Sequence, residues 1–232
     1  TNVKILITIL GTWVLCPVIS GLIAMAFYSF TKNFLLKRKL HILRLDAYTR
    51  TALLLAGAFG AYSLGANNIA NVMGVFVPIS PFTDISISSF FVFSSKEQLF
   101  LLGGIAIAVG VFTYSKRVMF TVGNDLLKMS PVAAFIVVIS HSIVLFLFAS
   151  QGISNFLQSI NLPSIPLVPV SSSQAVVGAV IGIGLLKGGK EVQWSIAGKI
   201  TVGWFTLPVI AAVISMLLLF ILSNIFNLSV SF

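Results

Sequence analysis

The feature that most constrains this chain is its series of long apolar stretches. About 20 apolar residues cross the hydrocarbon core of a bilayer, and stretches of roughly that length fill residues 3–30, 51–78, 99–115, 131–150 and 200–223. Only 8% of the 232 residues are charged, whereas roughly a quarter are charged in ordinary soluble domains. This pattern excludes a water-soluble globule and a disordered chain. It predicts an all-α, polytopic integral membrane protein.

The basic residues predict the orientation of these spans. Twelve of the 14 Lys and Arg residues lie in residues 32–50, 116–128 and 187–199. Positively charged connections stay on the cytoplasmic side, so we expect all three segments there. We expect residues 79–98, a predicted loop or interfacial turn, on the opposite side, together with residues 151–170, whose three prolines disfavour a regular helix. Since the basic residues form no continuous face, nucleic-acid binding is not expected.

Two apolar segments form an internal repeat. The sequence WVLCPVISGLIAM of residues 13–25 is identical to WFTLPVIAAVISM of residues 204–216 at six of thirteen positions, which include a Trp and a Pro. Basic residues follow the first copy and precede the second, so the two helices are expected to cross the membrane in opposite directions. Such inverted-topology repeats are typical of secondary transporters.

The repeat predicts a division of the chain. Residues 1–30 are expected to be the last transmembrane helix of a first repeat, and residues 31–50 a basic cytoplasmic linker. Residues 51–232 are expected to form a second, inverted repeat with broken or re-entrant helices and two substrate-site hairpins. The rest of the first repeat, on the order of 170 residues, is expected to precede Thr1.

Two polar motifs interrupt the apolar sequence and form the candidate site: Gly65-Ala66-Asn67-Asn68-Ile69-Ala70-Asn71 and Ser171-Ser172-Ser173-Gln174. Where a helix breaks, the N–H groups that begin its second half can hold an anion, and Ser hydroxyls and Asn or Gln amides add neutral donors. The carbonyl oxygens freed at a break, with the amide oxygens of Asn68 and Asn71, suit Na⁺. The predicted substrate-binding residues are Asn67, Asn68, Asn71, Ser171, Ser172, Ser173 and Gln174, and the predicted cation ligands are Asn68 and Asn71.

Helix packing is the structural alternative for both motifs, because small residues let membrane helices approach and Asn can bond between helices. Three Asn within five residues are nevertheless costly to bury unpaired, which favours a functional role. Other chemistry is not indicated. No Lys follows in P-loop spacing, Cys16 is the single cysteine, and His41 and His141 match no metal-ligand spacing, so an ATPase or a metal centre is not expected.

At these motifs the sequence resembles the inorganic phosphate transporter (PiT) family. GANNIANVMG, residues 65–74, is similar to the family's GANDVANA signature. PVSSSQAVVGAVIGIGLLKG, residues 169–188, is similar to its second motif, in which a Pro-Val-Ser-Thr-Thr-His type run precedes a Gly-rich half-helix. Residues 121–125 and Ser130-Pro131 resemble the link between the motifs. The resemblance covers roughly residues 50–222. It implies two inverted repeats, with phosphate between re-entrant hairpins and sodium ions beside it.

Two residues depart from the family pattern. Asn68 stands where the signature has Asp, and Gln174 stands where His is common. Nothing titratable remains at either motif, so the departures favour coupling to sodium over coupling to protons. They also leave room for another oxyanion, because some relatives resemble sulfate permeases.

Together these features predict a sodium-coupled symporter of inorganic phosphate in the cell membrane, working by alternating access, with no enzyme activity and no organic cofactor. Its expected partners are phosphate, sodium, the lipid bilayer, the missing N-terminal repeat and, by analogy, a second copy in a homodimer. Three alternatives stay open: a sulfate or other oxyanion permease on the same scaffold, an uncoupled anion channel, and a membrane-embedded scaffold or receptor.

Overall fold

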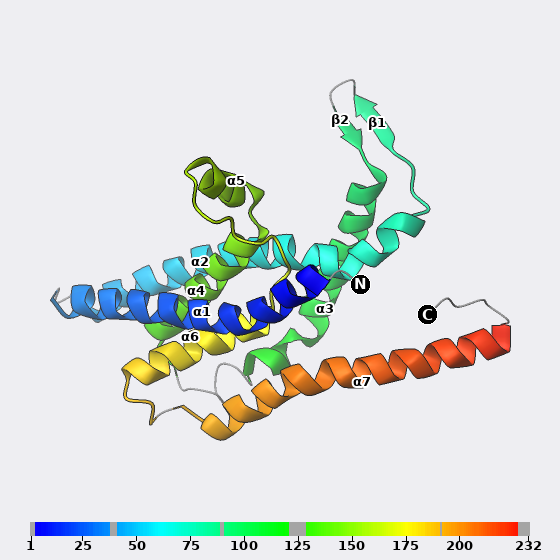
Figure 1. Cartoon of the computed structure of the whole chain (residues 1–232). Helices are drawn as coiled ribbons and strands as arrows, with labels where there is room; N and C mark the ends of the chain where they lie inside the picture. Colours follow the sequence, from blue (N-terminus) through cyan, green and yellow to red (C-terminus); the bar gives the residue numbers. More distant parts are fainter. Residues whose placement is uncertain (1–2, 38–40, 89–90, 121–128, 191, 227–232) are drawn as a thin grey trace. The chain divides into compact units, whose positions relative to one another are not determined.

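The computed structural model describes residues 3–37, 41–88, 91–120, 129–190 and 192–226. The chain forms two compact units, Thr1–Val192 and Gln193–Phe232. The second unit holds helix α7 (Trp194–Phe226). The elements of the first unit are α1 (Val3–Lys37), α2 (Ile42–Met73), the 3₁₀ helix η1 (Gly74–Ile79), strands β1 (Ile85–Ser88) and β2 (Phe91–Phe93), α3 (Ser95–Phe120), α4 (Pro131–Ala149), α5 (Gln151–Ser159) and α6 (Ser172–Leu186) (Figure 1).

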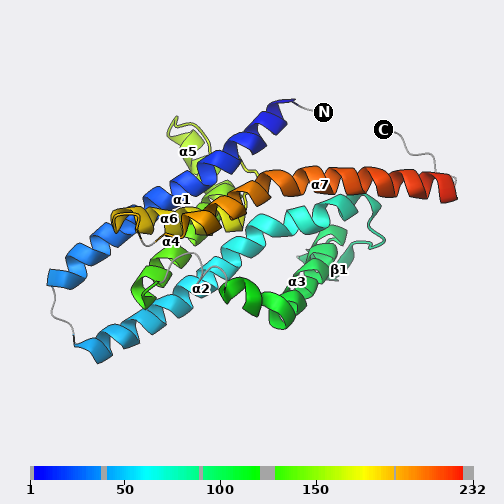
Figure 2. The ribbon, with the colours of Figure 1, turned by 90° about the horizontal axis from the view of Figure 1, so that it is seen from below.

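Helices α1, α2, α4 and α6 of the first unit pack into a bundle, in which α4 contacts each of the other three. α1 and α6 run in one direction, and α2 and α4 run in the opposite direction (Figures 1 and 2). One buried cluster of the bundle consists of Cys16, Val144, Leu145, Phe148, Val170 and Ala175. Since Val170 and Ala175 flank the start of α6, this cluster fixes the place where the second polar motif begins.

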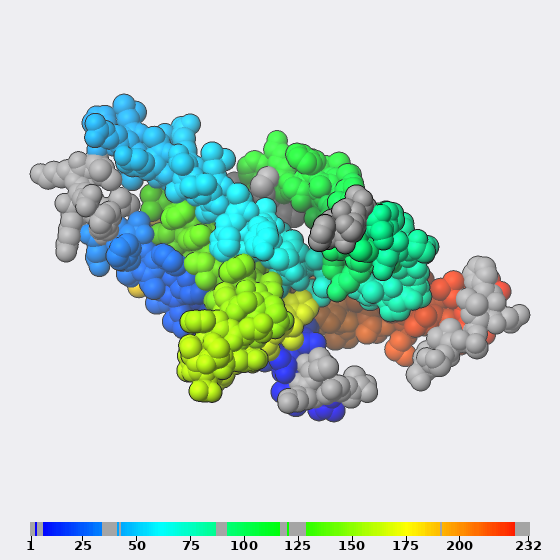
Figure 3. Space-filling model, turned by 90° about the horizontal axis from the view of Figure 1, so that it is seen from above, coloured from blue at the N-terminus to red at the C-terminus, as the bar shows by residue number. Residues whose placement is uncertain are grey.

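The helix directions gather basic residues at one end of the bundle. α1 ends and α2 begins there, and α6 ends there shortly before Lys187 and Lys190 (Figure 1). α5 and the proline-containing residues 160–170 connect the end of α4 to the start of α6, away from the basic end (Figure 1). Figure 3 shows α5, in yellow-green, on the surface of the first unit. The predicted two-sided topology, with this basic end in the cytoplasm, stays a prediction.

Small residues let α1 and α6 approach until their backbones touch. Gly178 and Gly182 of α6 are spaced as in a GxxxG motif, which favours close helix packing in membranes. A Cβ added at Gly178 would overlap the carbonyl oxygen of Pro17, and one added at Gly182 would lie 2.5 Å from the carbonyl oxygen of Gly21. The contact between these two helices therefore depends on the absence of side chains.

Within the described part of the chain, four helical segments are long and apolar enough to cross a membrane: Ile7–Asn33, Ser95–Lys116, Pro131–Ala149 and Trp194–Ile225. These segments confirm the predicted spans near the N-terminus, at 99–115, at 131–150 and at 200–223. Helix α6 is apolar but has only 15 residues, fewer than the roughly 20 that a full span needs. The chain is thus a multi-pass membrane protein.

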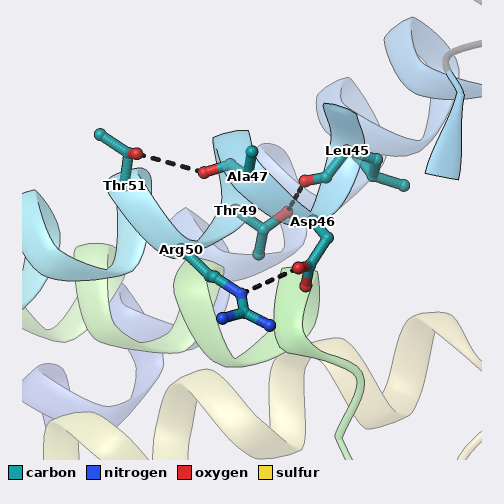
Figure 4. Close-up of polar contacts among 6 residues, drawn as sticks. All are labelled: Leu45, Asp46, Ala47, Thr49, Arg50 and Thr51. Carbon is teal, nitrogen blue, oxygen red and sulfur yellow. Dashed lines mark hydrogen bonds and ion pairs between the residues drawn. The ribbon is translucent and has the colours of Figure 1, made fainter. Parts of the chain in front are cut away.

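Much of the predicted linker, residues 31–50, is helical, since α1 continues to Lys37 and α2 begins at Ile42. In the first turns of α2, Asp46 pairs with Arg50 at 2.8 Å and the hydroxyl of Thr49 donates to the carbonyl oxygen of Leu45 (Figure 4). The exposed ion pair adds little stability. The hydrogen bond of the Thr49 hydroxyl to the carbonyl oxygen four residues earlier satisfies a polar side chain within the helix. The polar residues of this segment therefore do not end α2.

The predicted helix break at the first polar motif is wrong, because α2 continues without interruption through Gly65–Asn71 and ends at Met73. The backbone changes only beyond the motif, where α2 passes into η1 at Gly74. The side chain of Asn67 bonds to Asn68 and Val170 and not to its own helix backbone, so it does not disturb the hydrogen bonds of the helix. The carbonyl oxygens expected to be freed at this motif therefore remain inside the helix.

Two connections also differ from expectation. Residues 79–98, predicted as a loop or turn, contain the antiparallel β1–β2 hairpin, and the carboxylate of Asp84 accepts a bond from the backbone N–H of Ser95 at the start of α3. Residues 151–170 begin with helix α5, whose N-cap Ser150 accepts from the N–H of Ile153. The prolines lie beyond this helix, in an irregular segment, as their restricted backbone predicted. The predicted link motif at residues 121–125 lies outside the described residues.

The contact between α1 and α6 predicts a difference between two glycine substitutions. Gly182→Ala introduces a methyl group against the backbone of Gly21, and overpacking of this kind costs about 1–3 kcal/mol. Gly11→Ala, also in a helix, meets no atom within 4 Å, so it gains helix propensity without a clash. We expect a lower midpoint of thermal unfolding in detergent for Gly182→Ala alone. Equal midpoints would contradict the proposed packing.

Candidate functional site

The side chain of Asn67 joins the two polar motifs. Its Nδ2 donates to the carbonyl oxygen of Val170 at 2.8 Å, and the N–H of Val170 donates to Oδ1 of Asn67 at 3.4 Å. Both residues are buried, at 5% and 3% exposure. Residues 103 positions apart in the chain are thereby held together by a two-way amide pairing, like that between two peptide groups.

The other two asparagines of the motif are less enclosed. Oδ1 of Asn68 accepts a bond from Nδ2 of Asn67 at 3.2 Å, and the residue is half-buried. Asn71, one helical turn beyond Asn67, is exposed. Asn67 thus lies in the interface between α2 and the segment that precedes α6. Asn68 and Asn71 are more exposed than Asn67.

The second motif forms the N-terminus of α6. Ser171 is the N-cap, and its Oγ accepts a bond from the N–H of Gln174 at 3.4 Å. The hydroxyls of Ser171 and Ser173 lie 2.9 Å apart. Ser172 is half-buried and Ser173 is exposed. The first N–H groups of a helix lack partners within it, and the helix dipole gives this end a partial positive charge. The motif is therefore suited to hold an anion with neutral groups.

Gln174 points into the protein interior. The residue is 4% exposed, and its Oε1 is buried without a hydrogen-bond partner within the described part of the chain. A buried acceptor without a donor costs free energy. Oε1 of Gln174 is therefore an unsatisfied acceptor within the described residues, and it lies in the same helical turn as the three serines.

The structure adds residues that the sequence motifs did not reveal. Oγ of Ser20 donates to the carbonyl oxygen of Ala175 at 2.6 Å, and Sγ of Cys16 lies 3.7 Å from the carbonyl oxygen of Ser171. Both side chains come from α1 and reach the start of α6. Their spacing of four residues within an apolar helix was the only available signal, since it puts them on one helical face.

The described residues contain no cluster of three or more His, Cys, Asp and Glu that could bind a metal ion. A groove of about 410 Å³ borders the first motif at Gly65 and Ala66. Its other lining residues, Ala61, Tyr62, Ile69, Phe100, Gly104 and Ile107, are mostly apolar, so this groove does not suit an anion.

The helices of this apolar chain bring two uncharged polar motifs together through Asn67 and Val170. The phosphate transporter family matches residues 1–155 and 162–230. The chain belongs to the phosphate transporter family.

Individual relatives are similar over most of this chain. A protein of Methanocaldococcus jannaschii, provisionally named a phosphate permease, is 28% identical over 94% of this chain and 61% of its own length. A human protein named sodium-dependent phosphate transporter 1 is 27% identical over 70% of this chain and 22% of its own length. The chain thus spans less than two thirds of these relatives. No solved structure matches it.

The pairing between Asn67 and Val170 predicts a specific loss of stability. Asn67→Ala leaves both backbone groups of Val170 buried without this partner, which costs about 1–3 kcal/mol per lost pairing. Asn71→Ala removes an exposed amide and serves as the control for loss of an asparagine. We expect thermal unfolding in detergent at a lower temperature for Asn67→Ala than for Asn71→Ala. If the two variants unfold together, Asn67 does not hold the motifs in contact.

Proposed function

We propose that this protein is a secondary active transporter that carries inorganic phosphate together with sodium across the cell membrane by alternating access. The observation that supports the proposal most is the pairing of Asn67 with Val170, which joins the two motifs in a chain of the phosphate transporter family. No covalent chemistry is needed for such a function, so we expect no enzyme activity. The remaining repeat and a homodimeric partner belong to the same proposal.

The chemistry of the second motif supports an oxyanion as the substrate. Ser172 and Ser173 contribute hydroxyls and backbone N–H groups at the start of α6, where the helix dipole favours negative charge. The side-chain amides of Asn68 and Asn71, on the helix whose Asn67 bonds to Val170, would supply further donors. Because these groups are neutral, they can bind phosphate without forming an ion pair that would oppose its release.

Electrostatics supports sodium as the coupling ion. An anion entering a cell moves against the membrane potential at about 2.3 kcal/mol per charge for each 100 mV, and bound Na⁺ ions cancel or reverse that cost. The amide oxygens of Asn68 and Asn71 suit a hard monovalent cation. The side chains of Asn68, Asn71 and Gln174 neither gain nor lose a proton near neutral pH. The human relative is named as sodium-dependent, which agrees with this choice.

Uptake measurements test the proposal directly. Liposomes that hold the full-length protein are expected to accumulate radiolabelled phosphate when a sodium gradient points inward, and excess unlabelled sulfate is expected to compete poorly. Phosphate uptake that does not depend on the sodium gradient would contradict the proposed sodium coupling. Stronger competition by sulfate than by unlabelled phosphate would assign the site to a different oxyanion.

A double substitution tests the residues. Asn68→Ala combined with Ser172→Ala removes one amide and one hydroxyl from the two motifs. We expect a rise in KM for phosphate of about a hundredfold or more, since each lost hydrogen bond to a charged group contributes about 1.5–3 kcal/mol. Thr113→Ala is the control, because its exposed hydroxyl bonds within α3. Unchanged KM in the double variant would place the binding site elsewhere.

A further inference from the structure

The start of α6 is held by side chains of α1 as well as by its own cap. Ser20 donates to the carbonyl oxygen of Ala175 at 2.6 Å, and the thiol of Cys16 contacts the carbonyl oxygen of Ser171 at 3.7 Å. Ser20, Cys16 and Ala175 are fully buried, at 0% exposure. These contacts therefore reach, from a neighbouring helix, the turn that carries Ser172, Ser173 and Gln174.

The two contacts also fix the register of the helices. Cys16 and Ser20 are four residues apart, and so are Ser171 and Ala175, so the same spacing is matched on two parallel helices. The backbone contacts of Pro17 with Gly178 and of Gly21 with Gly182 continue the seam. A slide of α6 by one helical turn, about 5.4 Å, or a rotation about its axis would break both side-chain contacts.

The donors Cys16 and Ser20 occur in α1 but not in the repeated segment of α7. In the related segment of α7, the position of Pro17 is again proline, at Pro208. The positions of Cys16 and Ser20 are instead occupied by Leu207 and Ala211, which cannot donate. A transmembrane helix of this type thus forms without them, which indicates that their role lies in the contact with α6.

We propose that Ser20 and Cys16 are positioning residues, which orient the first turn of α6 so that its N–H groups and serine hydroxyls converge on the transported anion. The inference rests on the proposed function, since the anion is taken to be phosphate. Hydrogen bonds prefer angles above about 150° and weaken steeply below about 120°. A rotation of this turn that moves its donors out of the preferred range therefore reduces anion affinity without removing any group that touches the anion.

Ser20→Ala is the test substitution, and it places at this position the residue that α7 carries at Ala211. The matched control is Thr12→Ala, because Thr12 is another buried hydroxyl of α1, at 2% exposure, but bonds within its own helix to the carbonyl oxygen of Ile9. Radiolabelled phosphate uptake and phosphate binding to the protein in detergent are measured for both variants, together with thermal unfolding.

We expect Ser20→Ala to raise the KM and the dissociation constant for phosphate by about three- to tenfold, the effect of one net hydrogen bond, with the maximal rate unchanged. Thr12→Ala is expected to keep both constants at the wild-type value. Ser20→Cys retains a weaker donor and is expected to fall between wild type and Ser20→Ala.

Three results would overturn the inference. Equal phosphate affinity in Ser20→Ala and Thr12→Ala would show that the bond to Ala175 does not orient the site. A fall in maximal rate or unfolding temperature without a change in phosphate affinity would assign Ser20 a purely structural role. If the wild-type protein neither takes up nor binds phosphate, the proposed function fails together with the inference, whereas the first two results leave the proposed function intact.

Discussion

The rest of the site depends on the pairing between the side-chain amide of Asn67 and the peptide unit of Val170. Val170 is buried, at 3% exposure, and a buried peptide group without a hydrogen-bond partner costs free energy, so this irregular backbone needs a partner from the protein. An Asn side chain presents one donor and one acceptor in the geometry of a peptide. It can therefore satisfy the N–H and the carbonyl oxygen of Val170 together, and in doing so it attaches α2 to the segment that leads into α6.

A second consequence is that α6 is held from two sides. α2 contacts the residue before its cap through Asn67, and α1 contacts its first turn through Cys16 and Ser20. The two supporting helices run in opposite directions (Figure 2). Gly178 and Gly182 remove the side chains that would keep α1 at a distance. The start of this short helix, which follows the cap Ser171, is therefore held by two neighbouring helices, although α6 is too short to cross the membrane.

The sequence predicted those features that arise from local composition. Apolar length identified the spans, including α4, and the resemblance of the second motif implied the half-helix that follows the serines, which is α6. The break expected near Asn67 was wrong, since a local reading could not show that a partner 103 residues away satisfies the asparagine. Helix α5 was missed because the three prolines dominated the reading of a segment whose first nine residues contain none. The contacts of Cys16 and Ser20 could not be predicted, because a sequence does not show which face of α1 meets α6.

The irregular segment between α5 and α6 has a property that follows from Pro163, Pro166 and Pro169. A proline has no backbone N–H, so each one removes a donor that would otherwise need a partner. Val168 donates its own N–H to the carbonyl oxygen of Pro166 at 2.9 Å. The rings also restrict the chain before folding, which lowers the conformational entropy lost when the segment is ordered. Residues 162–169 can thus lead into Val170 without the regular backbone hydrogen bonds of a helix or a sheet.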